Sequence, residues 1–64
     1  MDWDTNEVCD WIANDEHLYN MAQSASIEGL AMEAEPYLRS TGSCNVDWDI
    51  VQWDEVHAQV QEES

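Results

Sequence analysis

The sequence predicts an all-α protein, a compact bundle of three to four short helices that forms a single small acidic domain over residues 1–64. Hydrophobic residues make up 44% of the chain and include four tryptophans, which is enough apolar surface for one small core. Apolar residues recur every three or four positions, the period of an α-helix. A tryptophan–aspartate pattern typical of a helix start also occurs twice, so each end of the chain is expected to be helical.

The first helix is predicted from about Thr5 to Ala13. With Asp4 as the N-cap, Glu7 takes the third helical position and completes a capping box. Trp3 and Val8 then occupy the two positions of a hydrophobic staple across the helix start. Three apolar side chains of this helix are expected to face the core: Val8, Trp11 and Ile12.

The middle of the chain is predicted to contain two interruptions. Asn14 and Asp15 are expected to end the first helix and cap a second, with one continuous helix as the alternative. Apolar residues then follow at helical spacing: Leu18, Tyr19, Met21, Ala22 and Ala25. Ser26 would cap a further helix from Ile27 to Ala34. Gly29 either weakens that helix by about 1 kcal/mol relative to alanine or lets another helix approach closely.

Pro36 is expected in the first turn of a new helical segment, because proline has no backbone N–H to donate inside a helix. That segment would comprise residues 37–39 and end at Gly42. Arg39, the single base of the chain, would then lie at a helix C-terminus, where the dipole favours a cation. Residues 42–47 form the expected loop, and the alternation over 46–48 has no second strand to pair with.

The last helix is predicted from about Ile50 to Gln61. Asp49 would be its N-cap with Gln52 as the capping-box partner, and Trp48 would staple onto Trp53. The pattern W-D-x-x-[EQ]-[VW] therefore starts both the first and the last helix. The inward-facing stripe is expected to contain Ile50, Trp53, Val56, His57 and Val60.

Charge is the unusual feature of this sequence. Fifteen acids face one base, and the formal net charge is −14. Direct nucleic-acid binding is not expected, because its affinity comes from basic groups that neutralise phosphates. No stretch approaches the ~18 apolar residues of a membrane span, and the N-terminus lacks the basic and apolar segments of a signal peptide. We therefore expect a cytoplasmic protein that does not bind membranes.

No metal site is expected from the spacing of possible ligands. Asn45, Asp47 and Asp49 have the opening spacing of an EF-hand loop, but Ile50 replaces the required glycine and Val56 the closing glutamate. Four residues that could ligate zinc lack the spacing of zinc motifs: Cys9, His17, Cys44 and His57. His57 is expected to be partly buried and structural, and His17 to be exposed.

Enzymatic activity and a cofactor are likewise not expected. The chain has two glycines in all, too few for a glycine-rich phosphate loop, and so short a chain builds few deep pockets. Carboxylate pairs perform acid–base chemistry only where a pocket moves their pKa values apart. The two cysteines are too few for a disulfide framework, so we expect buried thiols, with one bridge between them as the alternative.

A surface with this charge can resemble DNA. Duplex DNA carries one charge per ~1.7 Å, so fourteen charges correspond to roughly 24 Å of duplex. Acids three or four positions apart on a helix have Cβ atoms about 5–6 Å apart, close to the spacing of phosphates along one strand. The acids predicted to bind a partner lie in three regions: Asp4, Glu7 and Asp10; Glu28, Glu33 and Glu35; and Asp47, Asp49, Asp54 and Glu55.

All four tryptophans adjoin an aspartate in the sequence. We interpret this alternation as a division of labour, in which the indoles anchor the helices from inside and the aspartates present charge outward. Rigid helices would spare the acids the entropy that a disordered acidic tail loses on binding.

In length, charge and absence of lysine, the chain resembles the small acidic DNA-mimic inhibitors made by phages and mobile elements, which include anti-CRISPR and anti-restriction proteins. The resemblance is one of type and includes no aligned motif. It implies a partner with a basic DNA-binding channel, such as a CRISPR surveillance complex at its PAM-reading or duplex-binding surface. Two alternatives remain: an acidic adaptor or antitoxin-like partner of a basic protein, and a salt-adapted protein with a solvated acidic coat. A monomer or homodimer is expected.

Overall fold

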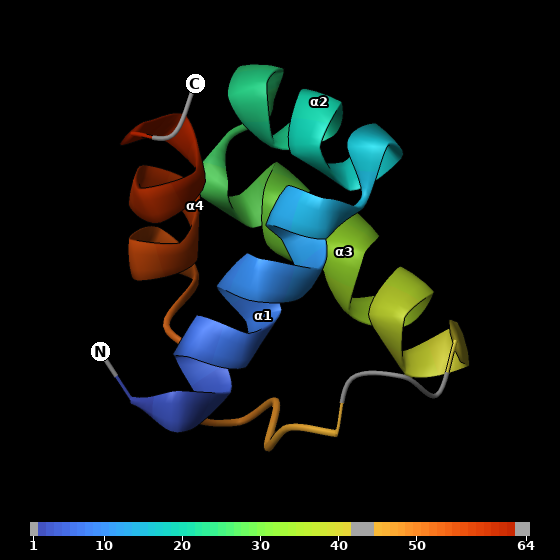
Figure 1. Cartoon of the computed structure of the whole chain (residues 1–64), viewed down its shortest axis with the longest axis vertical. Coiled ribbons are helices and arrows are strands. Elements are labelled where there is room, and N and C mark those ends of the chain that lie inside the picture. Colours follow the sequence, from blue (N-terminus) through green and yellow to red (C-terminus); the bar gives the residue numbers. More distant parts are fainter. Residues whose placement is uncertain (1, 42–44, 63–64) are drawn as a thin grey trace.

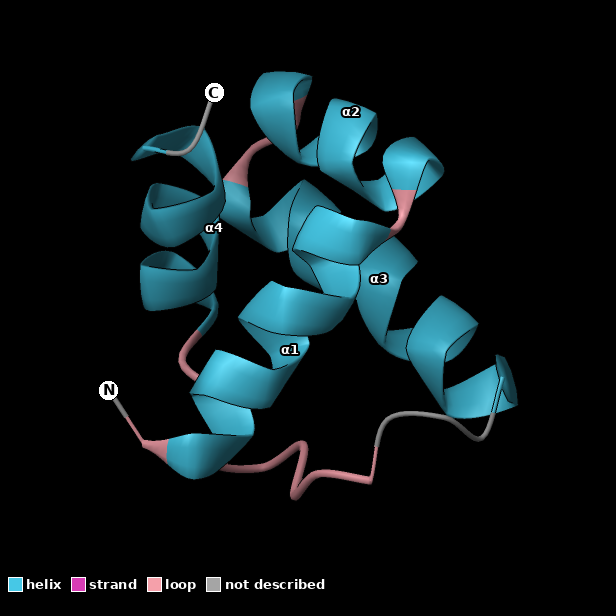
Figure 2. Ribbon diagram, in the orientation of Figure 1, coloured by secondary structure: helices cyan, strands magenta, loops and turns pink. Residues whose placement is uncertain are grey.

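The computed structural model describes residues 2–41 and 45–62, which form four α-helices around one core (Figure 1). The helices are α1 (Trp3–Asn14), α2 (Glu16–Ser24), α3 (Ile27–Thr41) and α4 (Trp53–Glu62). Over the described ranges the chain contains helices and loops and no strand (Figure 2). The predicted all-α bundle is therefore confirmed.

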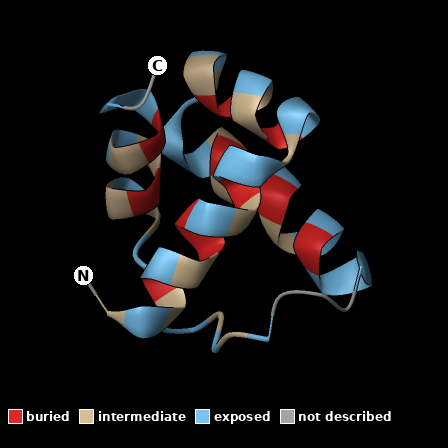
Figure 3. Cartoon of the chain, in the orientation of Figure 1, coloured by how far each residue is buried: buried red, intermediate tan, exposed pale blue. Residues whose placement is uncertain are grey.

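The core lies where the four helices meet, and each helix contributes one buried side (Figure 3). The largest fully buried apolar side chains are Ile12, Leu18, Leu30, Leu38, Val8, Val56 and Val60. α1 packs against α2 and α4, and α3 packs against α2 and α4. The resulting body measures 25 × 23 × 20 Å.

α1 begins two residues earlier than predicted, and its N-cap is Asp2. The Asp2 Oδ1 atom accepts a hydrogen bond from the Thr5 backbone N–H at 2.9 Å. The prediction of Asp4 as the cap is therefore wrong, and so is the staple, because Trp3 lies in the first turn and is 62% exposed. The earlier start buries Thr5, whose Oγ1 accepts a hydrogen bond from the distant Gln52 N–H at 3.1 Å. This long-range bond is what a local capping pattern cannot anticipate.

Asp15 separates α1 from α2 as predicted. Its backbone N–H donates to the Ile12 carbonyl and closes α1, while its Oδ1 accepts from the Leu18 N–H at 3.0 Å and opens α2. The chain therefore forms two helices here, and the alternative of one continuous helix is wrong. Leu18 and Ala22 then form the buried side of α2.

Ser26 caps α3, also as predicted. Its Oγ accepts from the Gly29 N–H at 3.1 Å, and its carbonyl accepts from the Leu30 N–H. A Cβ on Gly29 would lie 3.3 Å from Ser26 Oγ, which is a tight contact. Gly29 thus makes room for the cap of its own helix, and the predicted approach of another helix at this position is wrong.

α3 continues through Pro36 to Thr41, so the prediction that Pro36 begins a separate segment is wrong. Proline removes the N–H that would donate to the Met32 carbonyl. Met32 is 75% exposed and Pro36 is also exposed, so water can reach that side of the helix. On the opposite side Ala34 and Leu38 are buried on either side of the proline, and their burial favours one continuous helix. Gly42, the predicted end, lies outside the described residues.

α4 begins at Trp53, three residues later than predicted, and Asp49 is not its cap. Residues 48–50 form a turn closed by the Ile50 N–H on the Asp47 carbonyl at 3.2 Å. Ile50 is 46% exposed, so the prediction that it faces inward is wrong. The next residue, Val51, is buried instead. Residues 45–47 form a loop as expected, whereas 42–44 lie outside the described residues.

The predicted contact between Trp48 and Trp53 is confirmed. Their rings stack with centroids 6.1 Å apart and planes 11° apart. Trp48 begins the turn and Trp53 begins α4, so the stack attaches the 45–52 segment to the last helix. Both rings also pack against the core.

Candidate partner-binding surface

The acids lie at the surface of the bundle. Of the fifteen acids, Glu63 lies outside the described residues, and none of the other fourteen is buried. Among the acids predicted to bind a partner, six are exposed: Asp10, Glu28, Glu33, Asp47, Asp49 and Asp54. The other four are half-buried: Asp4, Glu7, Glu35 and Glu55.

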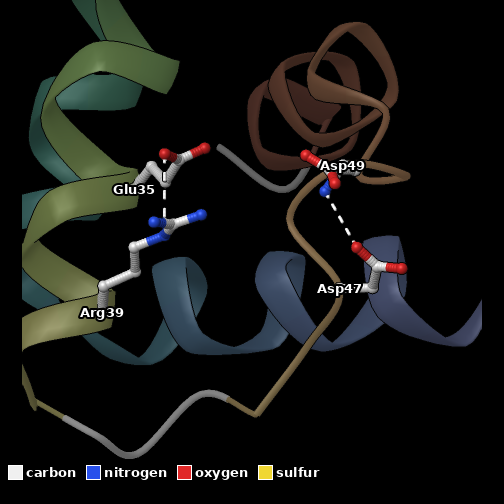
Figure 4. Close-up of polar contacts among 4 residues, drawn as sticks. All are labelled: Glu35, Arg39, Asp47 and Asp49. Carbon is white, nitrogen blue, oxygen red and sulfur yellow. Dashed lines mark hydrogen bonds and ion pairs between the residues drawn. The ribbon is translucent and has the colours of Figure 1, made fainter.

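Asp4, Asp47 and Asp49 are brought together by backbone hydrogen bonds. The Asp47 N–H donates to Asp4 Oδ1 at 3.0 Å. The Asp49 N–H donates in turn to Asp47 Oδ1 at 3.1 Å (Figure 4). Both carboxylates accept from a peptide group, which offsets part of the repulsion between neighbouring charges. The 45–52 segment therefore carries its acids to the start of α1.

The first predicted row is consequently divided between two places. At about 100° per residue, Asp4 lies roughly 120° from Asp10 around the helix, whereas Glu7 lies between them. Asp4 joins the 45–52 segment, and Glu7 and Asp10 remain together on the outer side of α1.

An open hollow of about 220 Å³ lies on that outer side of α1. It is lined by Glu7, Asp10, Trp11 and Asn14. Trp11 is half-buried. It packs against the core, as predicted, and it also lines the hollow. Asn14 Nδ2 donates to the Asp10 carbonyl at 2.9 Å, which holds the amide beside the hollow.

Trp11 and Asn14 line this surface site but are not predicted from the sequence as members of it. The available signal was their spacing. Together with Glu7 and Asp10 they occupy positions i, i+3, i+4 and i+7 of one helix, which share a side. Because Trp11 is predicted to face the core, this spacing predicts only a row of charge.

The acids of α3 differ in their surroundings. Glu28 and Glu33 are exposed and lie about 140° apart around the helix. Glu35 pairs with Arg39, with 3.7 Å between Oε2 and Nε (Figure 4). The Arg39 guanidinium also lies 5.8 Å from the Trp48 ring centroid. Glu35 thus helps hold the lone base in the last turn of α3, where that base was predicted.

Two acids of α4, Asp54 and Glu55, lie in its first turn, where the helix dipole stabilises negative charge. Asp54 is exposed. Glu55 is half-buried, and its Oε2 is buried with no hydrogen-bond partner among the residues that the structure describes. Asp54 is therefore better placed than Glu55 to present charge to a partner.

Two capping carboxylates have lowered pKa values. Hydrogen bonds from Thr5 lower the pKa of Asp2, and the backbone N–H of Leu18 lowers the pKa of Asp15. The Tyr37 hydroxyl also donates to Asp15 Oδ2 at 3.2 Å, and this bond raises the pKa of Tyr37. These two acids serve the helix starts and are fully charged at neutral pH.

His57 holds α4 against the junction of α2 and α3. Its Nε2 lies 2.8 Å from the Ala25 carbonyl oxygen, which can only accept, so this nitrogen carries the hydrogen. The predicted half-buried, structural histidine is confirmed, and His17 is exposed as predicted. Cys9 is buried in α1, and Cys44 lies outside the described residues.

Within residues 2–41 and 45–62, no group of three or more histidine, cysteine, aspartate or glutamate side chains could hold a metal ion. In the same part of the chain, none of the helices has the length and apolar character needed to cross a bilayer.

No protein-family model, curated protein or solved structure matches this chain, so the interpretation of its surface rests on its own geometry.

Proposed function

We propose that this protein inhibits a DNA-binding protein by occupying its basic DNA-binding surface. The leading candidate for that target is a CRISPR surveillance complex, which would make the protein an anti-CRISPR. One observation carries the proposal: fourteen acids, none of them buried, cover a helical body whose longest extent is 25 Å. A duplex of that length carries about 15 phosphate charges at one per ~1.7 Å. The formal net charge of the chain is −14.

The fixed backbone of the bundle supports this proposal over a disordered acidic tail. Residues 45–52 carry two of the acids and are tied to α1 by the Asp4–Asp47 and Thr5–Gln52 hydrogen bonds. The Trp48–Trp53 stack ties the same segment to α4. Acids held in place before binding lose little conformational entropy when they meet a basic surface.

Direct binding to nucleic acid is not part of the proposal. The chain has a single base, Arg39, and that base is already paired with Glu35 and lies over Trp48. The protein therefore offers no group that would displace counterions from phosphates. We propose instead that it acts in the cytoplasm by protein–protein contact, as a monomer or homodimer without a cofactor.

The test offers a purified CRISPR surveillance complex its target duplex with and without saturating protein. Loss of duplex binding, relieved by excess duplex, is the expected result. Normal duplex binding would refute the anti-CRISPR form. If protein and duplex occupy the complex together, mimicry is refuted there, and the acidic adaptor becomes the better explanation.

One observation favours the salt-adapted alternative: the acids occur on all four helices and in the 45–52 segment. A solvated coat needs such an even spread, whereas a mimic needs one side that follows a basic groove. The two explanations differ in the salt that the fold requires and in whether one side of the molecule dominates binding.

A further inference from the structure

We infer that the outer side of α1 docks an arginine side chain of a basic partner protein, held in the hollow between Glu7, Asp10, Trp11 and Asn14. The inference rests on the proposed function and deepens it, because it names one part of the acidic surface and one residue type that this part receives. A basic partner would then contact the outer side of α1 in preference to the other acids of the surface.

The outer side of α1 is a continuous stripe. At about 100° per residue, Trp3 and the four hollow residues lie within an arc of about 100°. The buried side of the same helix, formed by Thr5, Val8, Cys9 and Ile12, points the opposite way. α1 therefore has one buried side and one side of exposed and half-buried residues (Figure 3). The second side includes Trp3, Glu7, Asp10 and Trp11.

Trp3 is unusually exposed to solvent for a tryptophan. Its side chain is 62% exposed although it begins a well-capped helix. Exposed tryptophans next to polar groups are typical of protein-binding sites, where the ring is covered only in the complex. It lies one turn before Glu7 on the same stripe, so a partner seated in the hollow would also reach Trp3.

The two acids of the hollow have unused hydrogen-bonding capacity. Among the described residues, no hydrogen bond or ion pair engages the carboxylates of Glu7 and Asp10. By contrast Asp4 and Asp47 accept from backbone N–H groups, and Glu35 faces Arg39. Asn14 uses its amide nitrogen on the Asp10 carbonyl, which leaves its oxygen as a further acceptor.

These groups suit a guanidinium better than an ammonium. A guanidinium is planar, stacks on an indole and donates to carboxylates through a rigid fork. Trp11 supplies the ring, and Glu7 and Asp10 supply carboxylates that line the same hollow. A hollow of about 220 Å³ is also smaller than the ~300–1,000 Å³ of small-molecule pockets, so it fits the end of a side chain.

The test uses the full chain with two peptide probes, an oligo-arginine and an oligo-lysine of the same length. Amide and indole chemical shifts are followed by NMR during titration. The expected shifts concentrate on residues 3–14 and on the Trp3 and Trp11 indoles. The arginine peptide is expected to bind roughly three- to fivefold more tightly, since an exposed guanidinium–indole contact contributes a modest free energy.

Two double variants separate this site from general charge. Glu7→Gln/Asp10→Asn should weaken the arginine peptide roughly fivefold, since it removes two carboxylate partners. Glu28→Gln/Glu33→Gln removes the same charge from exposed positions of α3 and should change the affinity less than about twofold. Far-UV circular dichroism of both variants shows whether the bundle is retained, and Trp3→Ala tests the exposed ring without touching an acid.

Equal losses in the two double variants, equal affinity for the two peptides, or shifts spread over all four helices would each overturn the inference. The peptide assay needs no DNA-binding target. If shifts map to α1 but no target loses its DNA, the proposed function fails and the arginine site stands. If DNA is displaced but the shifts lie on α3 or α4, the arginine site fails and the proposed function stands.

Discussion

The backbone N–H of Asp47 donates to Asp4 Oδ1 at 3.0 Å, across 43 positions of the sequence. At the next residue of α1, the Gln52 N–H donates to Thr5 Oγ1 at 3.1 Å. The two bonds attach the 45–52 segment to the first turn of α1, as its path beside the start of that helix shows (Figure 1). The start of α1 and the approach to α4 therefore depend on each other.

Replacing Thr5 by valine should lower the free energy of unfolding by about 1–2 kcal/mol, because the Gln52 N–H loses its acceptor in a partly buried place. Chemical denaturation measures the loss, and faster hydrogen exchange at the Gln52 amide locates it. Thr5→Ser keeps the hydroxyl and is the matched control. Unchanged exchange at Gln52 in the valine variant would contradict the role given to this bond.

Replacing Pro36 by alanine should raise the free energy of unfolding by about 1–2 kcal/mol. Alanine restores an N–H for the Met32 carbonyl within α3, and the greater freedom of the unfolded chain offsets only part of that gain. Thermal unfolding measures the change. A lower melting temperature would instead show that the proline ring itself contributes to the fold.

Asp15 should make the stability depend on pH through its lowered pKa. The pKa is below the ordinary 3.8, so the charged cap contributes stability above pH 3.8 and loses it as pH falls through the folded value. The difference in unfolding free energy between the protein and Asp15→Asn should therefore be constant near neutral pH and should change to another constant value in strong acid, as the cap is protonated. Glu33→Gln controls for the loss of one charge, and a difference that is the same at neutral pH and below both pKa values would contradict the assignment.

The helical spectrum should be present at 0.1 M salt and change little with more salt. At that ionic strength the Debye length is ~10 Å, shorter than the 25 Å extent of the body, so repulsion across the molecule is screened. Circular dichroism over a salt titration measures this, and sedimentation gives the monomer or dimer mass. A coil spectrum that becomes helical only in molar salt would favour the salt-adapted alternative.

Helix starts could be predicted where a capping residue lies between two apolar periods. Asp15 and Ser26 each lie at such a position and cap the helices that follow them. At the first helix Asp2 and Asp4 both fit, and the choice depends on the distant Thr5–Gln52 bond. The prediction of Asp49 as a cap is wrong because tertiary packing buries Val51, and α4 begins only at Trp53.

The candidate site was predictable in composition but not in grouping. Unpaired acidic side chains are seldom buried, so their location at the surface could be predicted from the residue type alone. Asp4 and Asp47 meet only through tertiary structure, which no local spacing reveals. The hollow on α1 follows helical spacing, but the half-burial of Trp11 that leaves part of its ring accessible depends on how the helices pack.

The position of Arg39 has a consequence for proteolysis. It is the single arginine or lysine of the chain, so trypsin can cut only the bond between Arg39 and Ser40. That bond lies in the last turn of α3, where an extended protease substrate cannot form until the turn opens. The rate of this one cut therefore reports directly on local unfolding at the end of α3, because trypsin cleaves no other peptide bond of the chain.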